Sequence, residues 1–150
     1  MIISNDCKVT SSDNNISITV EKIKISMPKT SSREEFKRSF EAVFGSKQAR
    51  TAKNVTYFWY VENYIPRLKG ESNILYIGKT KQTLYQRHFR YSETETNNFN
   101  WSRYKHILEK YGDIYVCFHH SDKDPRELEK LLLTKSFFDH CELPPINGSF

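Results

Sequence analysis

The sequence predicts an α+β fold, in which a small, mostly antiparallel three-stranded sheet is flanked by helices and follows a β/α extension. Two apolar, β-prone segments at residues 55–61 and 73–77 have no helix between them, so we expect them to pair as a hairpin. Two helical segments, a third strand and a last helix follow. The order β-β-α-α-β-α is typical of a sheet whose faces are covered by helices.

The chain of 150 residues is long enough for one domain with a real core. Aromatic residues make up 14% of it, and nine are tyrosines, which pack with the ring and hydrogen-bond with the hydroxyl. The net charge of +5 favours a polyanionic partner without requiring one.

Three scattered cysteines, Cys7, Cys117 and Cys141, indicate no disulfide framework and fit a reducing compartment. No apolar segment reaches the length of a membrane span, and the first residues lack the pattern of a secretion signal. We therefore expect an intracellular protein of the cytoplasm, nucleoid or nucleus that is not secreted and has no membrane partner.

Residues 1–52 are predicted to form an N-terminal extension, and residues 53–150 the main domain. Apolar residues alternate from Ile16 to Val20 and continue one position out of phase at Ile23, which indicates a bend or bulge in a strand.

A helix is expected to begin at Ser31–Ser32 and to end before Gly45, with one apolar stripe formed by Phe36, Phe40, Val43 and Phe44. Its basic residues could contact DNA. A helix packed on the sheet, with its charges in solvent, is the favoured interpretation.

Alternation along residues 55–61 places Tyr57 in the more apolar set and Tyr60 in the more polar one. If one face packs on helices and the other lines a cleft, Tyr60 belongs to the cleft. The other elements are expected as a loop at 62–72, a helix at 81–91, a loop at 92–100, a helix at 101–111, a strand at 113–119, a helix from a cap at Asp124 to about 138 with Glu127 closing a capping box, and an extended tail.

The stretch from Leu75 to Tyr91 reads LYIGKTKQTLYQRHFRY, a strand that breaks at Gly78 and leads into a basic helix with Arg87 and Tyr91 one turn apart. This stretch resembles the second half of a GIY-YIG nuclease domain. Further on, a Leu-Glu pair at residues 128–129 precedes two leucines, and a Pro-x-x-Asn ends at Asn147, as in that family. The resemblance covers roughly residues 55–147. No literal Gly-Ile-Tyr precedes the second motif.

The resemblance implies a divalent-metal-dependent endonuclease that hydrolyses phosphodiester bonds in DNA, as a restriction or repair enzyme does. It implies active-site roles for Tyr60, Tyr76, Lys79, Arg87, Tyr91, Glu129 and Asn147. The first tyrosine is Tyr60 or, as an alternative, Tyr57. A tyrosine is the usual candidate for the general base in the family.

The residue types suit this chemistry even when the resemblance to the family is set aside. Arg87 offers a permanently charged bidentate donor for phosphate oxygens. Glu129 shares a stripe with two leucines and suits one Mg²⁺ or Mn²⁺ ion, whose other positions water and phosphate fill. A phenol has a pKa near 10, so use as a base requires Lys79, Arg87 or the metal to lower it. Lys79, Lys81, His88 and Arg90 are the predicted nucleic-acid contacts. Duplex DNA is the expected partner, and a homodimer would allow both strands to be cut.

Three alternatives stay open. The fold could bind nucleic acid without cleaving it. Tyr76 could be an ordinary strand aromatic and Arg87 a surface charge paired with Glu93 or Glu95. The soft ligands of the C-terminal third could instead bind zinc, although none has Cys-x-x-Cys spacing: these are Cys117, His119, His120, His140 and Cys141.

Overall fold

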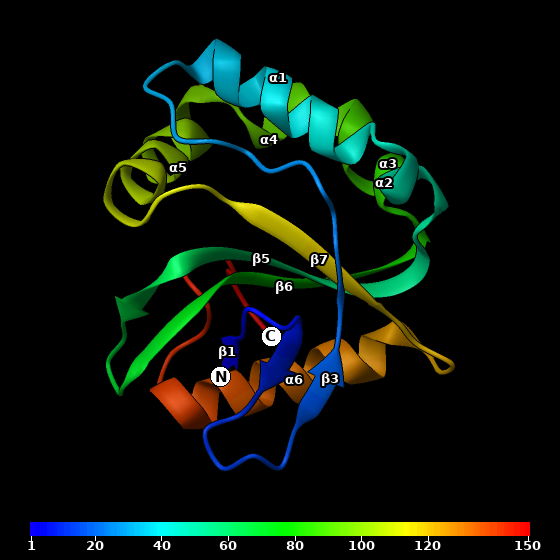
Figure 1. Ribbon diagram of the computed structural model, residues 1–150, viewed down its shortest axis with the longest axis vertical. Helices are drawn as coiled ribbons and strands as arrows, with labels where there is room; N and C mark the ends of the chain where they lie inside the picture. Colours follow the sequence, from blue (N-terminus) through cyan, green and yellow to red (C-terminus); the bar gives the residue numbers. More distant parts are fainter.

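The computed structural model describes residues 1–150 as an α+β fold in three layers (Figure 1). A four-stranded antiparallel sheet, in the order β4-β7-β5-β6, lies between two helical layers. Helices α1 to α5 cover one face, and α6 covers the other beside a three-stranded antiparallel sheet, β1-β2-β3. The elements are β1 (Ile2–Ile3), β2 (Lys8–Thr10), β3 (Ser17–Thr19), β4 (Glu21–Lys22), α1 (Arg33–Phe44), α2 (Lys47–Thr51), β5 (Lys53–Pro66), β6 (Glu71–Thr83), α3 (Leu84–His88), a 3-10 turn (Phe89–Tyr91), α4 (Ser92–Glu95), α5 (Asn98–Tyr111), β7 (Tyr115–His120) and α6 (Pro125–His140).

The central hairpin is longer than the sequence predicts. Ladder pairs persist to Pro66 opposite Glu71, and Gly70 takes the left-handed backbone conformation (φ 67°) at the turn. The prediction of a loop over residues 62–72 was therefore wrong. Exposed polar residues in the outer half of a hairpin resemble a loop in sequence, although their backbone groups still pair.

Two helix starts also differ from prediction because polar residues serve as caps. Strand β6 runs on to Thr83, whose hydroxyl accepts a hydrogen bond from Gln86 N–H and so starts α3 at residue 84 rather than 81. Asn97 likewise caps α5, so the expected loop at 92–100 is largely helical. Asp124 caps α6 as predicted, through Arg126 N–H, without the capping box expected with Glu127.

The N-terminal extension contributes to both layers around the sheet. The predicted change of phase corresponds to a change of sheet at Val20. Strand β3, before Val20, belongs to the small sheet, and β4, after it, pairs with β7 in the large one. The α1 stripe of Phe36, Phe40, Val43 and Phe44 is fully buried. Helix α1 is therefore a packed helix, as the favoured interpretation held.

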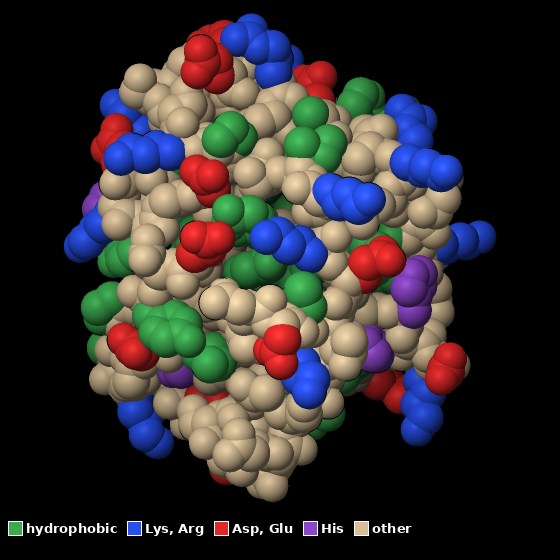
Figure 2. Space-filling view, viewed as in Figure 1, with side chains coloured by type: hydrophobic (Ala, Val, Ile, Leu, Met, Phe, Trp, Pro, Cys, Tyr) green, Lys and Arg blue, Asp and Glu red, His purple; other side chains and the backbone are tan.

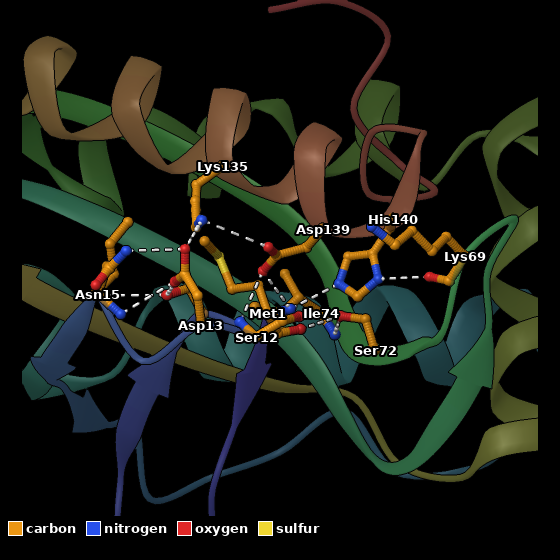
Figure 3. A network of polar contacts seen from close by, with 12 residues as sticks. Met1, Ser12, Asp13, Asn15, Lys69, Ser72, Ile74, Lys135, Asp139 and His140 are labelled. Atoms are coloured by element: carbon orange, nitrogen blue, oxygen red, sulfur yellow. Dashed lines mark hydrogen bonds and ion pairs between the residues drawn. The ribbon is translucent and has the colours of Figure 1, made fainter.

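A polar network attaches the small sheet to the C-terminal end of α6 (Figure 3). The Met1 ammonium and Ser12 N–H both donate to Asp139 Oδ2 at 3.0 Å, and the Met1 nitrogen lies 2.7 Å from His140 Nε2. Ser72 Oγ donates to the Met1 carbonyl at 2.6 Å. Burial acts to raise the pKa of Asp139, but the hydrogen bonds that Asp139 accepts from Met1 and Ser12 outweigh burial and lower that pKa. The buried charges on this side are thus matched by hydrogen bonds.

Candidate active site

Two tyrosines meet on the sheet face that α1 and α5 cover. Tyr57 on β5 lies opposite Gly78 on β6, and its ring centre is 5.9 Å from that of Tyr76. A Cβ at Gly78 would lie 2.6 Å from Tyr57 Cζ and 2.6 Å from Tyr76 Cε1. The glycine of the Tyr-Ile-Gly segment therefore provides the space in which the two phenols approach each other.

Tyr60 lies on the other face of the sheet, away from Tyr76. Its ring packs 5.5 Å from that of Tyr115 and belongs to the cluster that includes Leu132 of α6. Tyr60 therefore does not face Tyr76, and the alternative tyrosine, Tyr57, does. Every residue from 55 to 61 is buried, because helices cover both faces, so polarity could not identify the cleft side.

Arg87 and His88 share one carboxylate. Arg87 Nη1 lies 3.5 Å and His88 Nδ1 3.0 Å from the Glu95 carboxylate. His88 is only 2% exposed and packs 4.3 Å from the Phe44 ring and perpendicular to Tyr57. His88 is therefore buried at the site and does not lie on the outer surface. The pairing of Arg87 with Glu95 is the one that the surface-charge alternative expected.

Burial and nearby charges set the protonation of the two phenols. Burial raises the pKa of Tyr57 well above its usual value, and negative charge at Tyr76 raises it further. Burial also raises the pKa of Tyr76, while the Tyr57 hydroxyl and the Arg87 guanidinium act to lower it. The Tyr57 hydroxyl faces Tyr76 but has no hydrogen-bond partner. Both phenols are therefore protonated at neutral pH, and Tyr76 has the surroundings better suited to a phenolate.

Glu129 on α6 is a half-buried carboxylate that no hydrogen bond or salt bridge accounts for. Burial raises its pKa, and the positive charges of Lys79 and Arg126 act to lower it. Its charge in turn acts to raise the pKa of Tyr76, as does that of Glu95. The charge of Glu129 thus acts on Tyr76, and the charge of Lys79 acts on Glu129. A single carboxylate of this kind suits Mg²⁺, which keeps most of its coordination sphere for water and phosphate.

Asn147 has a structural position at the free edge of β6. Ile77 N–H donates to Asn147 Oδ1 and Asn147 Nδ2 donates to the Ile77 carbonyl, both at 2.9 Å. Ile146 N–H adds a hydrogen bond to the Leu75 carbonyl at 2.9 Å. The tail therefore pairs with the strand that carries Tyr76, and it holds that strand in place at the site.

The other predicted contacts lie outside this group. Lys81 Nζ is 3.8 Å from Asp124 at the start of α6. Tyr91 is 42% exposed, with the Arg90 guanidinium 4.9 Å from its ring centre. The structure does not bring Tyr91 to the tyrosine pair, because α3 ends at His88 and a 3-10 turn follows.

A pocket of about 190 Å³ opens beside Tyr76 and Arg87. Its lining also contains residues that the sequence did not indicate, among them Trp59, Glu95 and Arg103. Glu95 was expected only as a surface partner, because it fell in a predicted loop. Arg103 shares a helix face with Asn100 and Tyr104, a spacing of three to four residues that could have indicated it.

The zinc alternative finds no suitable geometry. No group of three or more His, Cys, Asp or Glu side chains is arranged to hold a metal ion. Cys117 is buried, Cys141 is exposed, and the His140 nitrogens face Met1 and the Lys69 carbonyl.

Charge on the face seen in Figure 2 is mixed: basic and acidic side chains are interspersed, with apolar side chains between them near the centre. None of the helices has the length and apolarity that crossing a bilayer requires. No family model, no curated protein and no solved structure matches this chain.

Proposed function

We propose that this protein is a divalent-metal-dependent DNA endonuclease of the GIY-YIG type. One observation carries the proposal: Tyr57, Arg87 and Glu129 come from three elements other than that of Tyr76, and all three act on the charge of the Tyr76 phenol, which lines one pocket with Arg87. The element order from β5 to α6 and the pairing of the two tyrosine strands also support it. Isolated surface residues would have no reason to converge in this way.

The chain's own groups suit phosphodiester hydrolysis. Arg87 can bind the scissile phosphate and stabilise the charge that develops on it. Tyr76 can hold the attacking water, and it can accept the water's proton once it has lost its own, a deprotonation that Arg87 and a hydrogen bond from Tyr57 act to favour. Lys79, whose charge acts on Glu129, can hold a second phosphate oxygen.

Glu129 is the residue that would hold the metal. Its half-buried carboxylate has no protein hydrogen-bond partner, which fits a ligand better than a structural acid. When bound, Mg²⁺ or Mn²⁺ would supply positive charge for the phosphate and the leaving oxygen.

The test is nicking of supercoiled plasmid with Mg²⁺ or Mn²⁺. We expect Glu129→Gln to abolish nicking and Glu127→Gln, an exposed acid on the same helix, to leave it unchanged. Arg87→Lys should lose rate more than DNA affinity, because the bidentate contact matters most in the transition state. Arg38→Lys on α1 is its control. Absence of nicking with either metal, or full activity of Glu129→Gln, contradicts the proposal.

A second candidate is binding of nucleic acid without cleavage. The pairing of Arg87 with Glu95 at 3.5 Å favours it, since a guanidinium already neutralised is less available to a reacting phosphate. Equal losses of affinity and rate in Arg87→Lys would support this candidate.

A further inference from the structure

The pocket beside Arg87 has the size for a single planar ring. Its volume of about 190 Å³ lies below the ~300–1,000 Å³ of pockets that hold drug-sized ligands. Trp59, Tyr104 and Ile146 give it apolar walls, and Asn100 adds an amide. Walls of this kind suit a nucleobase, which stacks on aromatic rings and hydrogen-bonds through its edge.

The lining of this pocket carries two arginines and one carboxylate, Glu95, so its net charge is positive. Arg87 and the exposed Arg103 both line it, so phosphates on either side of an inserted base would meet guanidinium groups. Phe99 precedes Arg103 by four residues on α5, which places both on one helix face. Phe99 is 78% exposed, an unusual position for a phenylalanine and a suitable one for stacking on a neighbouring base.

The floor of the pocket contains polar atoms that lack partners. Only three buried side-chain polar atoms in the protein make no hydrogen bond, namely Tyr57 Oη, Trp59 Nε1 and His88 Nε2. Trp59 and His88 line the pocket, and Tyr57 packs against His88. With a proton on His88 Nδ1 facing Glu95, Nε2 is an acceptor and the indole N–H is a donor. Both atoms are covered in this structure, so a base edge, which presents both complementary groups, reaches them when the lining side chains move aside.

We infer that this pocket receives an unpaired nucleobase next to the phosphate at Arg87. The inference rests on the proposed function and names its substrate class: DNA with an unpaired nucleotide at the cleavage site, rather than continuous duplex. A base inside a duplex could not reach the pocket without leaving the stack, which costs least where it has no partner.

The test measures binding in EDTA, where cleavage cannot occur. Three labelled DNAs are compared by fluorescence anisotropy: a duplex, the same duplex with one bulged nucleotide, and the same bulge without its base. We expect the bulged nucleotide to bind at least about fivefold more tightly than either of the others, as one stacked base contributes. Equal affinity for the bulge with and without its base overturns the inference.

Variants locate the effect. Phe99→Ala and Arg103→Gln, both at exposed positions, should reduce the preference for the bulged base, while Phe138→Ala, an exposed phenylalanine on α6, should keep it. An unchanged preference in both pocket variants also overturns the inference. If plasmid nicking fails and the preference is found, the proposed function falls and the base pocket stands. If nicking succeeds without the preference, the pocket alone falls.

Discussion

The two faces of β5 differ in how their buried polar groups are satisfied. On the face toward α1 and α5 lie Tyr57 Oη, Trp59 Nε1 and His88 Nε2, which have no partner. On the face toward α6, Asn73 exchanges two hydrogen bonds of 2.8 Å with the Ile3 backbone, and Thr56 Oγ1 donates to the Pro125 carbonyl.

This difference bears on the stability of the sheet and on the proposed site. A buried polar group without a partner costs about 1–3 kcal/mol, so the three unpaired atoms on the face toward α1 and α5 destabilise the fold. The buried polar groups around Met1 on the α6 face are paired and carry no such cost. Unsatisfied groups gathered in one place mark a site, as strain and misfit tend to do.

The largest effect is expected at the glycine between the two phenols. In Gly78→Ala the new Cβ would lie 2.6 Å from Tyr57 and Tyr76 atoms, so both rings must move. We expect a loss of about 3 kcal/mol in the free energy of unfolding, measured by urea denaturation, together with loss of nicking. Gly148→Ala, with no atom within 4 Å of the new Cβ, is the control. A stable and active Gly78→Ala would show that the phenols do not need this contact.

A smaller loss is expected where the tail holds β6. Asn147→Ala removes two hydrogen bonds to Ile77, each contributing about 0.5–1.5 kcal/mol, so the expected loss is about 2 kcal/mol. Ser149→Ala on the exposed tail should change nothing. Unchanged stability of Asn147→Ala would mean that the edge of β6 does not depend on it.

Hydroxyl deletions compare the two faces directly. Ser72→Ala removes a satisfied hydroxyl and should cost about 1 kcal/mol. Tyr57→Phe removes an unsatisfied one and should leave the free energy of unfolding unchanged or raise it. Both changes are read from the midpoint of urea denaturation. A large loss in Tyr57→Phe would reveal a partner for that hydroxyl.

The smallest effect is on pH dependence. Burial lowers the pKa of His88 on one face and of His140 on the other, so the folded state favours neutral rings. The stabilisation is complete above the usual pKa of 6.5 and decreases as pH falls below it, by less than about 1.4 kcal/mol per pH unit for each histidine. His88→Gln and His140→Gln should each flatten the dependence between pH 7 and 5. An unchanged slope in both would contradict this assignment.

The fold could be predicted further than the site. Periodicity and caps indicated the hairpin, the stripe of α1 and the start of α6, because each depends on local sequence. The extent of the hairpin depended on backbone pairing close to its turn, as between Pro66 and Glu71, among exposed residues that lack an alternating apolar pattern. The choice between Tyr57 and Tyr60 depended on which face of the sheet carries Tyr76, and the joining of Glu95 to Arg87 and His88 depended on the turns after α3. None of these pairings and contacts can be predicted from a local sequence pattern.

The most direct test compares the two tyrosines of β5 in one assay. Plasmid nicking with Mg²⁺ is measured for the wild type, Tyr57→Phe and Tyr60→Phe, with folding checked by urea denaturation. We predict that Tyr57→Phe slows nicking about a hundredfold while Tyr60→Phe keeps the wild-type rate. A wild-type rate in Tyr57→Phe, or a loss confined to Tyr60→Phe, would contradict the assignment of the active site to the face of Tyr76 and Arg87.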